Sequence, residues 1–156
     1  MSIDTAVVRA RVGEAIQAYQ GAVDDFDREV ARLMGVNETD LRCLEILLGV
    51  ETATPSWLGA RLGLTSGSVT TMLDRLEKLD YLTRAPHETD RRKIVVRITA
   101  HATEHAYALL GPFLEDSEKV LDRYTPEQLT LITDFLTTNR ENQEAHVRRL
   151  RDASNS

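Results

Sequence analysis

Side chains that can both donate and accept hydrogen bonds gather in one short stretch of this 156-residue chain. They occupy the start of a segment with helical spacing and are Thr65, Ser66, Ser68, Thr70 and Thr71. Arg75 follows one turn later. Short hydroxyl side chains allow a helix to approach a nucleic-acid groove closely, and we expect Arg75 to contact a phosphate. The alternative is that these hydroxyls only cap the helix and face solvent.

A second distinctive segment carries acid and base between two apolar runs. Asp90 is followed by Arg91 and Arg92, and a β-branched run comes directly after them. Proline, acid and base between two such runs are typical of a hairpin tip. We therefore expect a two-stranded wing at about 81–98, whose tip follows a DNA backbone and inserts an arginine into the minor groove. The alternative is an ordinary solvated hairpin.

Two short helices are expected to present the hydroxyl stretch. Thr54 and Pro55 open the first, as a hydroxyl cap followed by a proline in the first turn, and Gly63 ends it. Thr65 caps the second, at about 65–79. The apolar positions at helical spacing are Trp57, Leu58 and Leu62 in the first helix, and Val69, Met72, Leu73, Leu76 and Leu79 in the second. Two helices joined through a glycine form the helix-turn-helix pattern.

These features together resemble the winged helix-turn-helix of the MarR (multiple antibiotic resistance regulator) family of bacterial transcription factors. The matching runs are LGARLGLTSGSVTTMLDRLEKLDYLTR and DRRKIVVRIT, the second with the family's Asp-x-Arg wing signature. The resemblance covers nearly the whole chain and implies a mainly α fold with a small β-wing. It implies a winged helix-turn-helix at 38–99, flanked by N- and C-terminal dimerisation helices at 3–34 and 100–150. It also implies that Asp90 pairs with a wing arginine and holds the tip.

Long amphipathic helices are expected on both sides of this region. In 3–34, apolar residues recur at heptad-like spacing, more than a small DNA-binding lobe needs for packing. This stripe either packs on the C-terminal helices of the same chain or builds a subunit interface. Similar stripes run through 100–150, where Thr125 and Pro126 mark a new helix start. We expect one MarR-like domain, 1–156, that forms a homodimer on double-stranded DNA. Its two recognition helices would enter successive major grooves, about 34 Å apart, and read a pseudo-palindrome.

The charge distribution supports a nucleic-acid partner although the whole chain carries −6. Between Leu58 and Ile98 there are eight cationic and five anionic side chains, a net of +3, so the remainder carries −9. A basic lobe on an acidic body orients a protein on DNA and limits non-specific binding.

Other function classes find little support in the sequence. The sequence contains no nucleophile elbow, phosphate-binding loop, dinucleotide fingerprint or HExxH motif. We expect the aspartate and glutamate side chains to lie on helix exteriors. The chain is therefore not expected to be an enzyme, and no cofactor is expected. No apolar run has membrane-spanning length and no signal peptide is visible, which predicts a cytoplasmic protein without a membrane partner. The more serious alternative is a winged-helix module that binds protein or ligand and has lost DNA binding.

Cysteine and histidine offer two further sites to weigh. Cys43, the one cysteine, excludes an internal disulfide and is expected to be a small core residue rather than a redox sensor. His101 and His105 are four residues apart, a spacing that can hold a metal, but no third ligand stands out and we expect no metal site.

The sequence indicates only in part which DNA bases the protein recognises and which effector regulates it. Many relatives carry an arginine near Thr71, so its absence here weakens direct guanine readout and leaves more to DNA shape and the wing. The resemblance also implies a small aromatic effector bound between the dimerisation helices and the DNA lobe. The aromatic residues that could line such a cleft, or equally pack in the core, are Trp57, Tyr19, Phe26 and Phe113. The effector and its binding residues are therefore left open.

Overall fold

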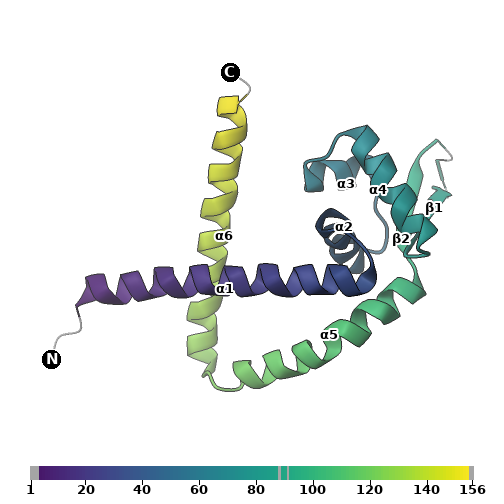
Figure 1. Ribbon diagram of the computed structural model, residues 1–156. Coiled ribbons are helices and arrows are strands. Elements are labelled where there is room, and N and C mark those ends of the chain that lie inside the picture. Colours follow the sequence, from purple (N-terminus) through teal and green to yellow (C-terminus); the bar gives the residue numbers. More distant parts are fainter. Residues whose placement is uncertain (1–3, 88, 91, 155–156) are drawn as a thin grey trace. The chain divides into compact units, whose positions relative to one another are not determined.

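The computed structural model describes residues 4–87, 89–90 and 92–154, and it is mostly helical with one small sheet (Figure 1). Its elements in chain order are α1 (Thr5–Met34), α2 (Glu38–Leu48), α3 (Pro55–Leu62), α4 (Ser66–Lys78), β1 (Leu82–Pro86), β2 (Ile94–Ile98), α5 (Ala100–Leu121) and α6 (Pro126–Ser154). The mainly α fold with a small β-wing is thus confirmed. The backbone forms two compact units, Met1–Leu109 and Leu110–Ser156, and the expected single domain stays a prediction.

Local capping explains where the helices of the first unit begin and end. Gly35 ends α1 in the left-handed conformation, with φ of 70°, which glycine adopts without steric cost. Asn37 caps α2 by accepting a hydrogen bond from the Asp40 backbone N–H at 2.8 Å. Thr54 caps α3 in the same way, and Gly63 ends it with φ of 69°. The predicted start of α3 after Thr54 and its end at Gly63 are thereby confirmed.

The core of the first unit joins α2, α3 and α4 to the sheet. Its most completely buried apolar side chains are Leu44, Leu47, Leu58, Met72, Leu73, Leu76, Leu82 and Val96. The helices α3 and α4 approach each other closely at Gly59, where an added Cβ would lie 3.0 Å from Val69 Cγ2. Glycine therefore suits this contact, because a methyl group would crowd Val69 and require a shift of a few tenths of an ångström.

Two residues of the predicted core are exposed instead. Trp57 keeps 39% of its surface accessible, and the Arg61 guanidinium lies 5.3 Å from its ring centroid. Leu79 is 40% exposed because it is the C-cap of α4, beyond the last buried turn. The period of the helix places both positions near the core, but α3 and α4 are too short to cover them.

The wing is a two-stranded antiparallel sheet with the predicted position. β1 and β2 pair from Leu82 opposite Ile98 to Pro86 opposite Ile94. An isolated bridge adds Ala53, from the segment before α3, to the outer side of β2, with Ala53 N–H donating to Val96 O at 3.0 Å. This bridge ties the wing to the start of the helix-turn-helix, so the two parts are held by backbone hydrogen bonds as well as by the core.

The turn between α4 and β1 carries a backbone conformation that suits glycine. Asp80 has φ of 57°, in the left-handed region, and its carbonyl accepts a hydrogen bond from Thr99 Oγ1 at 2.6 Å. We expect Asp80→Gly to raise the free energy of unfolding by about 0.5–1 kcal/mol, because glycine adopts this conformation without strain and keeps the carbonyl. Asp80→Ala should lower it instead, and urea denaturation of the three proteins would show whether the order is glycine, aspartate, alanine.

The second unit contains the end of α5 and all of α6. Pro112 lies inside α5, which continues past it to Leu121. Thr125 and Gln128 form a reciprocal capping box at the start of α6, with hydrogen bonds of 3.3 and 2.9 Å, as the sequence predicts. None of the described helices has the length and apolarity that a membrane span requires.

Candidate nucleic-acid interface

The hydroxyl stretch forms the exposed start of α4. Thr65 is its N-cap and accepts a hydrogen bond from the Ser68 backbone N–H at 3.3 Å. The side chains of Ser66, Ser68, Thr70 and Thr71 are all exposed. The opposite side of the helix is buried, as the sequence predicts, and its buried residues are Val69, Met72, Leu73 and Leu76. The structure therefore brings five of the predicted DNA-contacting residues together on one helix.

Two of these hydroxyls are already engaged with their own helix. Thr70 Oγ1 donates to the Ser66 carbonyl at 3.0 Å, and Thr71 Oγ1 donates to the Gly67 carbonyl at 3.1 Å. A threonine hydroxyl has one hydrogen and two lone pairs. After donating inward, each of these oxygens offers an acceptor to an incoming ligand, with the γ-methyl group beside it.

Arg75 has a partner that the sequence did not reveal. Its Nη2 and Nε donate to the two carboxylate oxygens of Asp40, at 2.6 and 3.1 Å. The Asp40 side chain is 3% exposed and the Arg75 side chain 44% exposed. The expectation that acids lie on helix exteriors is therefore wrong for Asp40. Burial is tolerated because the carboxylate accepts two charge-assisted hydrogen bonds and lies at the positive N-terminal end of α2.

The Asp40–Arg75 pair orients α4 relative to α2. It joins α2 to α4 across 35 positions of sequence, and the bidentate geometry fixes both distance and rotation. Phosphate contact by Arg75 stays a prediction, in which the guanidinium would serve Asp40 and DNA together. The only indication of this ion pair in the sequence was the position of Asp40, three residues after the Asn37 cap.

A second ion-pair cluster fastens the wing to α4. Arg84, in β1, donates from Nε to a Glu77 carboxylate oxygen at 3.1 Å, and its Nη2 lies 2.7 Å from Asp74 Oδ1. The hydrogen bond from Arg84 lowers the pKa of Glu77 below its ordinary value of 4.5, so the carboxylate stays charged at neutral pH. These contacts hold β1, the first strand of the wing, against α4.

At the wing tip, Asp90 Oδ1 accepts a hydrogen bond from the Arg92 backbone N–H at 3.2 Å, and Asp90 Oδ2 lies 3.8 Å from Lys93 Nζ. The expected pairing of Asp90 with a wing arginine stays a prediction. Arg91 lies outside the described residues. The exposed Arg92 side chain is left at the tip, as the minor-groove prediction requires.

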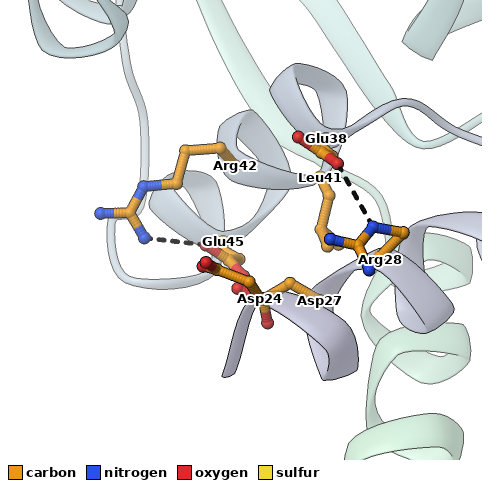
Figure 2. A pocket seen from close by; sticks show the side chains of 7 residues that line it. All are labelled: Asp24, Asp27, Arg28, Glu38, Leu41, Arg42 and Glu45. Atoms are coloured by element: carbon orange, nitrogen blue, oxygen red, sulfur yellow. Dashed lines mark hydrogen bonds and ion pairs between the residues drawn. The ribbon is translucent and has the colours of Figure 1, made fainter. Parts of the chain in front are cut away.

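A polar pocket lies between α1 and α2 (Figure 2). Its volume is about 290 Å³, and the residues that line it are Asp24, Asp27, Arg28, Glu38, Leu41, Arg42 and Glu45. Ion pairs join Arg28 to Glu38 and Arg42 to Glu45. Partial burial, together with the charge of Glu45, raises the pKa of Asp27 above its ordinary 3.8. Four carboxylates and two guanidinium groups give this pocket an excess of negative charge.

Cys43 is a core residue, as the sequence predicts. It is fully buried in α2, and burial together with the neighbouring Asp40 charge raises the pKa of its thiol to about 12. The reactive thiolate is therefore absent at neutral pH.

We expect native protein to resist alkylation at pH 8 and to be labelled at Cys43 at least tenfold faster once unfolded in urea. Mass spectrometry of timed iodoacetamide reactions would measure both rates. Equal rates would restore the redox-sensing alternative.

His101 and His105 belong to an aromatic cluster around Tyr81. Their ring centroids are 6.2 Å apart, and His105 Nδ1 lies 3.0 Å from the Tyr81 hydroxyl, which donates to the Met34 carbonyl at 2.9 Å. In the described part of the chain, no three histidine, cysteine or acidic residues converge in a way that could hold a metal ion. The contact of Tyr81 with the end of α1 was not visible in the sequence, because these residues are 47 positions apart.

Known proteins are similar to this chain in sequence. A family model described as "MarR family" matches residues 34–93. The HTH-type transcriptional regulator YcgE of Bacillus subtilis is 33% identical over 126 residues, which are 81% of this chain and 82% of that protein. The HTH-type transcriptional regulator MhqR of the same organism is 27% identical, over 77% of this chain and 82% of its own.

Solved structures agree in fold. RV1404 from Mycobacterium tuberculosis superposes with a TM-score of 0.66 at 18% identity, over 90% of this chain and 95% of its own. The transcriptional regulator Tm0710 from Thermotoga maritima gives 0.62 at 24% identity, over 88% and 96%. The relatives are transcriptional regulators and not enzymes. With its helix-turn-helix, its wing and these relatives, the chain belongs to the MarR family of DNA-binding transcriptional regulators.

Proposed function

We propose that this regulator is a ligand-responsive repressor that binds a pseudo-palindromic operator as a homodimer. The observation that supports the proposal most is the exposed hydroxyl face of α4 beside a wing that presents Arg92. This face lies in the segment of the chain that carries net positive charge, +3 between Leu58 and Ile98. Small side chains on a reading helix and cations around it are what the major groove and the phosphate backbone require.

In this proposal the first turns of α4 lie in the major groove. Ser66, Ser68, Thr70 and Thr71 approach base edges, and Thr65 lies at the backbone. The wing tip, with Arg91 and Arg92, enters the adjacent minor groove. Bound across a promoter, the protein would exclude the transcription machinery, and its binding to chromosomal DNA would place it in the cytoplasm.

Exposed apolar side chains support the homodimer. On α1 they include Val8, Val12 and Tyr19, the last with 67% of its surface accessible. On α6 they include Leu131, Leu136 and Leu150, which are 55–71% exposed. These helices are 30 and 29 residues long, and their exposed apolar stripes need a partner. In a two-fold symmetric dimer, each copy would bury these stripes of the other.

We expect Leu150→Asp to weaken the dimer, because a carboxylate in an apolar interface is desolvated without a partner. Sedimentation equilibrium at micromolar concentration should show a dimer for the unaltered protein and more monomer for the variant. Gln143→Asp, at an exposed polar position of α6, is the matched control and should leave the dimer intact. A monomer in the unaltered protein would contradict the homodimer.

The small aromatic effector remains a prediction. Of the four aromatic residues considered for it, none lines the α1–α2 pocket, and Trp57 and Tyr19 are exposed. The excess of carboxylates in that pocket disfavours an aromatic acid there, because like charges repel across a short distance. Binding would be measured as the release of DNA on titration with neutral and anionic aromatic compounds, and a coupling of ~1–3 kcal/mol would suffice for induction.

A mobility-shift titration tests the function as a whole. The probe would be DNA flanking the gene that encodes this chain, with an unrelated duplex of equal length as competitor. A shift that survives the competitor, with affinity falling as salt rises, is the expected result. Absence of any specific complex at low salt would favour the alternative, a winged-helix module that binds protein or ligand without DNA.

A further inference from the structure

The hydrogen bonds of α4 restrict which base edges this helix can contact directly. In its first two turns the exposed side chains are serine and threonine, with no lysine, arginine, asparagine or glutamine among them. The hydroxyl hydrogens of Thr70 and Thr71 are donated to the Ser66 and Gly67 carbonyls. The outward groups at these two positions are therefore an oxygen acceptor and a methyl group.

Arg75, the first cation of α4, is held against α2. Both carboxylate oxygens of Asp40 accept from its guanidinium, through Nε and Nη2, and the Asp40 side chain is 3% exposed. Moving these two groups onto a base would leave the buried carboxylate unpaired, so only Nη1 is left to contact DNA. Asp40 thus acts as a positioning residue that keeps Arg75 on α2.

The surface around the two threonines is open to a base edge. One hollow beside α4 is lined by residues that include Gly67, Thr71 and Arg75, and a second is lined by residues that include Ser66 and Thr70. Between them, a Cβ at Gly67 would meet no atom within 4 Å. Base edges can therefore come close to both threonines.

The major-groove edges of the bases respond differently to such a surface. Guanine presents two acceptors, N7 and O6, and is usually bound by a bidentate arginine or lysine. Adenine presents an amino donor beside N7, and thymine presents its 5-methyl group. An acceptor oxygen fits the amino group of adenine or of cytosine, and the adjoining methyl group adds a contact that only the A·T pair offers, through the thymine methyl group.

We propose that α4 specifies A·T base pairs in the major groove, with Thr70 and Thr71 accepting from the adenine amino group and packing against the thymine methyl group. This inference rests on the proposed DNA-binding function. It assigns Thr70 and Thr71 as the specificity-determining residues of the helix and makes Arg75 a positioning group.

The test begins with a pool of duplexes that contain 20 randomised base pairs, from which the unaltered protein selects its own site. In the selected duplex each thymine is then replaced by uracil and each adenine by purine, which lacks the amino group. Both changes leave the minor-groove edges, and so the wing contacts, unaltered. Purine also removes one Watson–Crick hydrogen bond to thymine, so its effect is compared between the unaltered protein and the Thr70→Val and Thr71→Val variants. We expect about a fourfold loss of affinity for uracil at one or more positions in each half-site, the worth of one buried methyl group, and a loss for purine beside it.

Paired variants identify the side chain responsible. Thr70→Ser and Thr71→Ser remove the methyl group, so one of them should bind thymine and uracil duplexes equally. Thr70→Val and Thr71→Val keep the shape and remove the acceptor, so one of them should lose the preference for adenine over purine. Thr130→Ser and Thr130→Val are matched controls, because Thr130 makes the same hydrogen bond, to the Pro126 carbonyl at 2.8 Å, on α6.

The possible outcomes separate this inference from the function on which it rests. If no duplex is enriched from the pool, DNA binding itself fails. If a site is enriched but is indifferent to uracil at every position, DNA binding stands and A·T readout by α4 is overturned. The base-analogue measurements use the unaltered protein, so they decide the matter even if a variant does not fold.

Discussion

Replacing Leu76 by alanine is expected to lower the free energy of unfolding by about 2–5 kcal/mol. Leu76 is a fully buried side chain of α4, on the side opposite the hydroxyl face. Its carbonyl also accepts the Tyr81 backbone N–H at 2.9 Å, and this bond is unaffected by the substitution. The loss therefore reports apolar contacts alone: three carbon atoms are removed from a core that α4 shares with α2, α3 and the wing.

Leu79→Ala is the matched control, because the same residue type stands three positions later and is 40% exposed. It should cost less than ~1 kcal/mol. Urea denaturation at one fixed protein concentration would measure both variants, since dimerisation makes apparent stability depend on concentration. A shift in midpoint without a change in slope is expected for Leu76→Ala. Equal losses in the two variants would contradict the assignment of Leu76 to the core and Leu79 to the surface.

Replacing Arg92 by alanine is expected to cost more than ~1 kcal/mol of operator binding, about fivefold in affinity, while the dimer stays intact. The wing does not need this side chain for its own shape, because Asp90 is hydrogen-bonded to the Arg92 backbone N–H and the Asp90 ion pair is with Lys93. The exposed guanidinium is therefore available for the narrow, negative minor groove.

Salt dependence gives this prediction a second readout. Loss of one cationic contact with the backbone should reduce the slope of log affinity against log salt by about 1. Arg123→Ala, an exposed arginine between α5 and α6, is the control and should change neither affinity nor slope. Unchanged binding by Arg92→Ala at matched salt would remove the wing from the DNA contact.

The sequence by itself determined the elements of this protein and their order. Caps and stops such as Asn37, Thr65 and Gly35 act on their own helix ends, so their residue types suffice to place them. The apolar stripe of α4 and the β-branched run of the wing are equally local signals. The exposure of the serine and threonine side chains of α4 could be predicted for the same reason, because residues opposite a buried apolar stripe face solvent.

The tertiary structure decided which polar groups meet. Asp40 and Arg75 are 35 positions apart, and only the packing of α4 against α2 brings the carboxylate within 2.6 Å of the guanidinium. The pairing of Arg84 with Asp74 and Glu77 likewise needs the wing folded back on α4. Sequence patterns report periodicity within an element. Ion pairs between elements depend on distances and rotations that the whole core sets, and here those contacts hold Arg75 against α2 while the threonines of α4 are exposed.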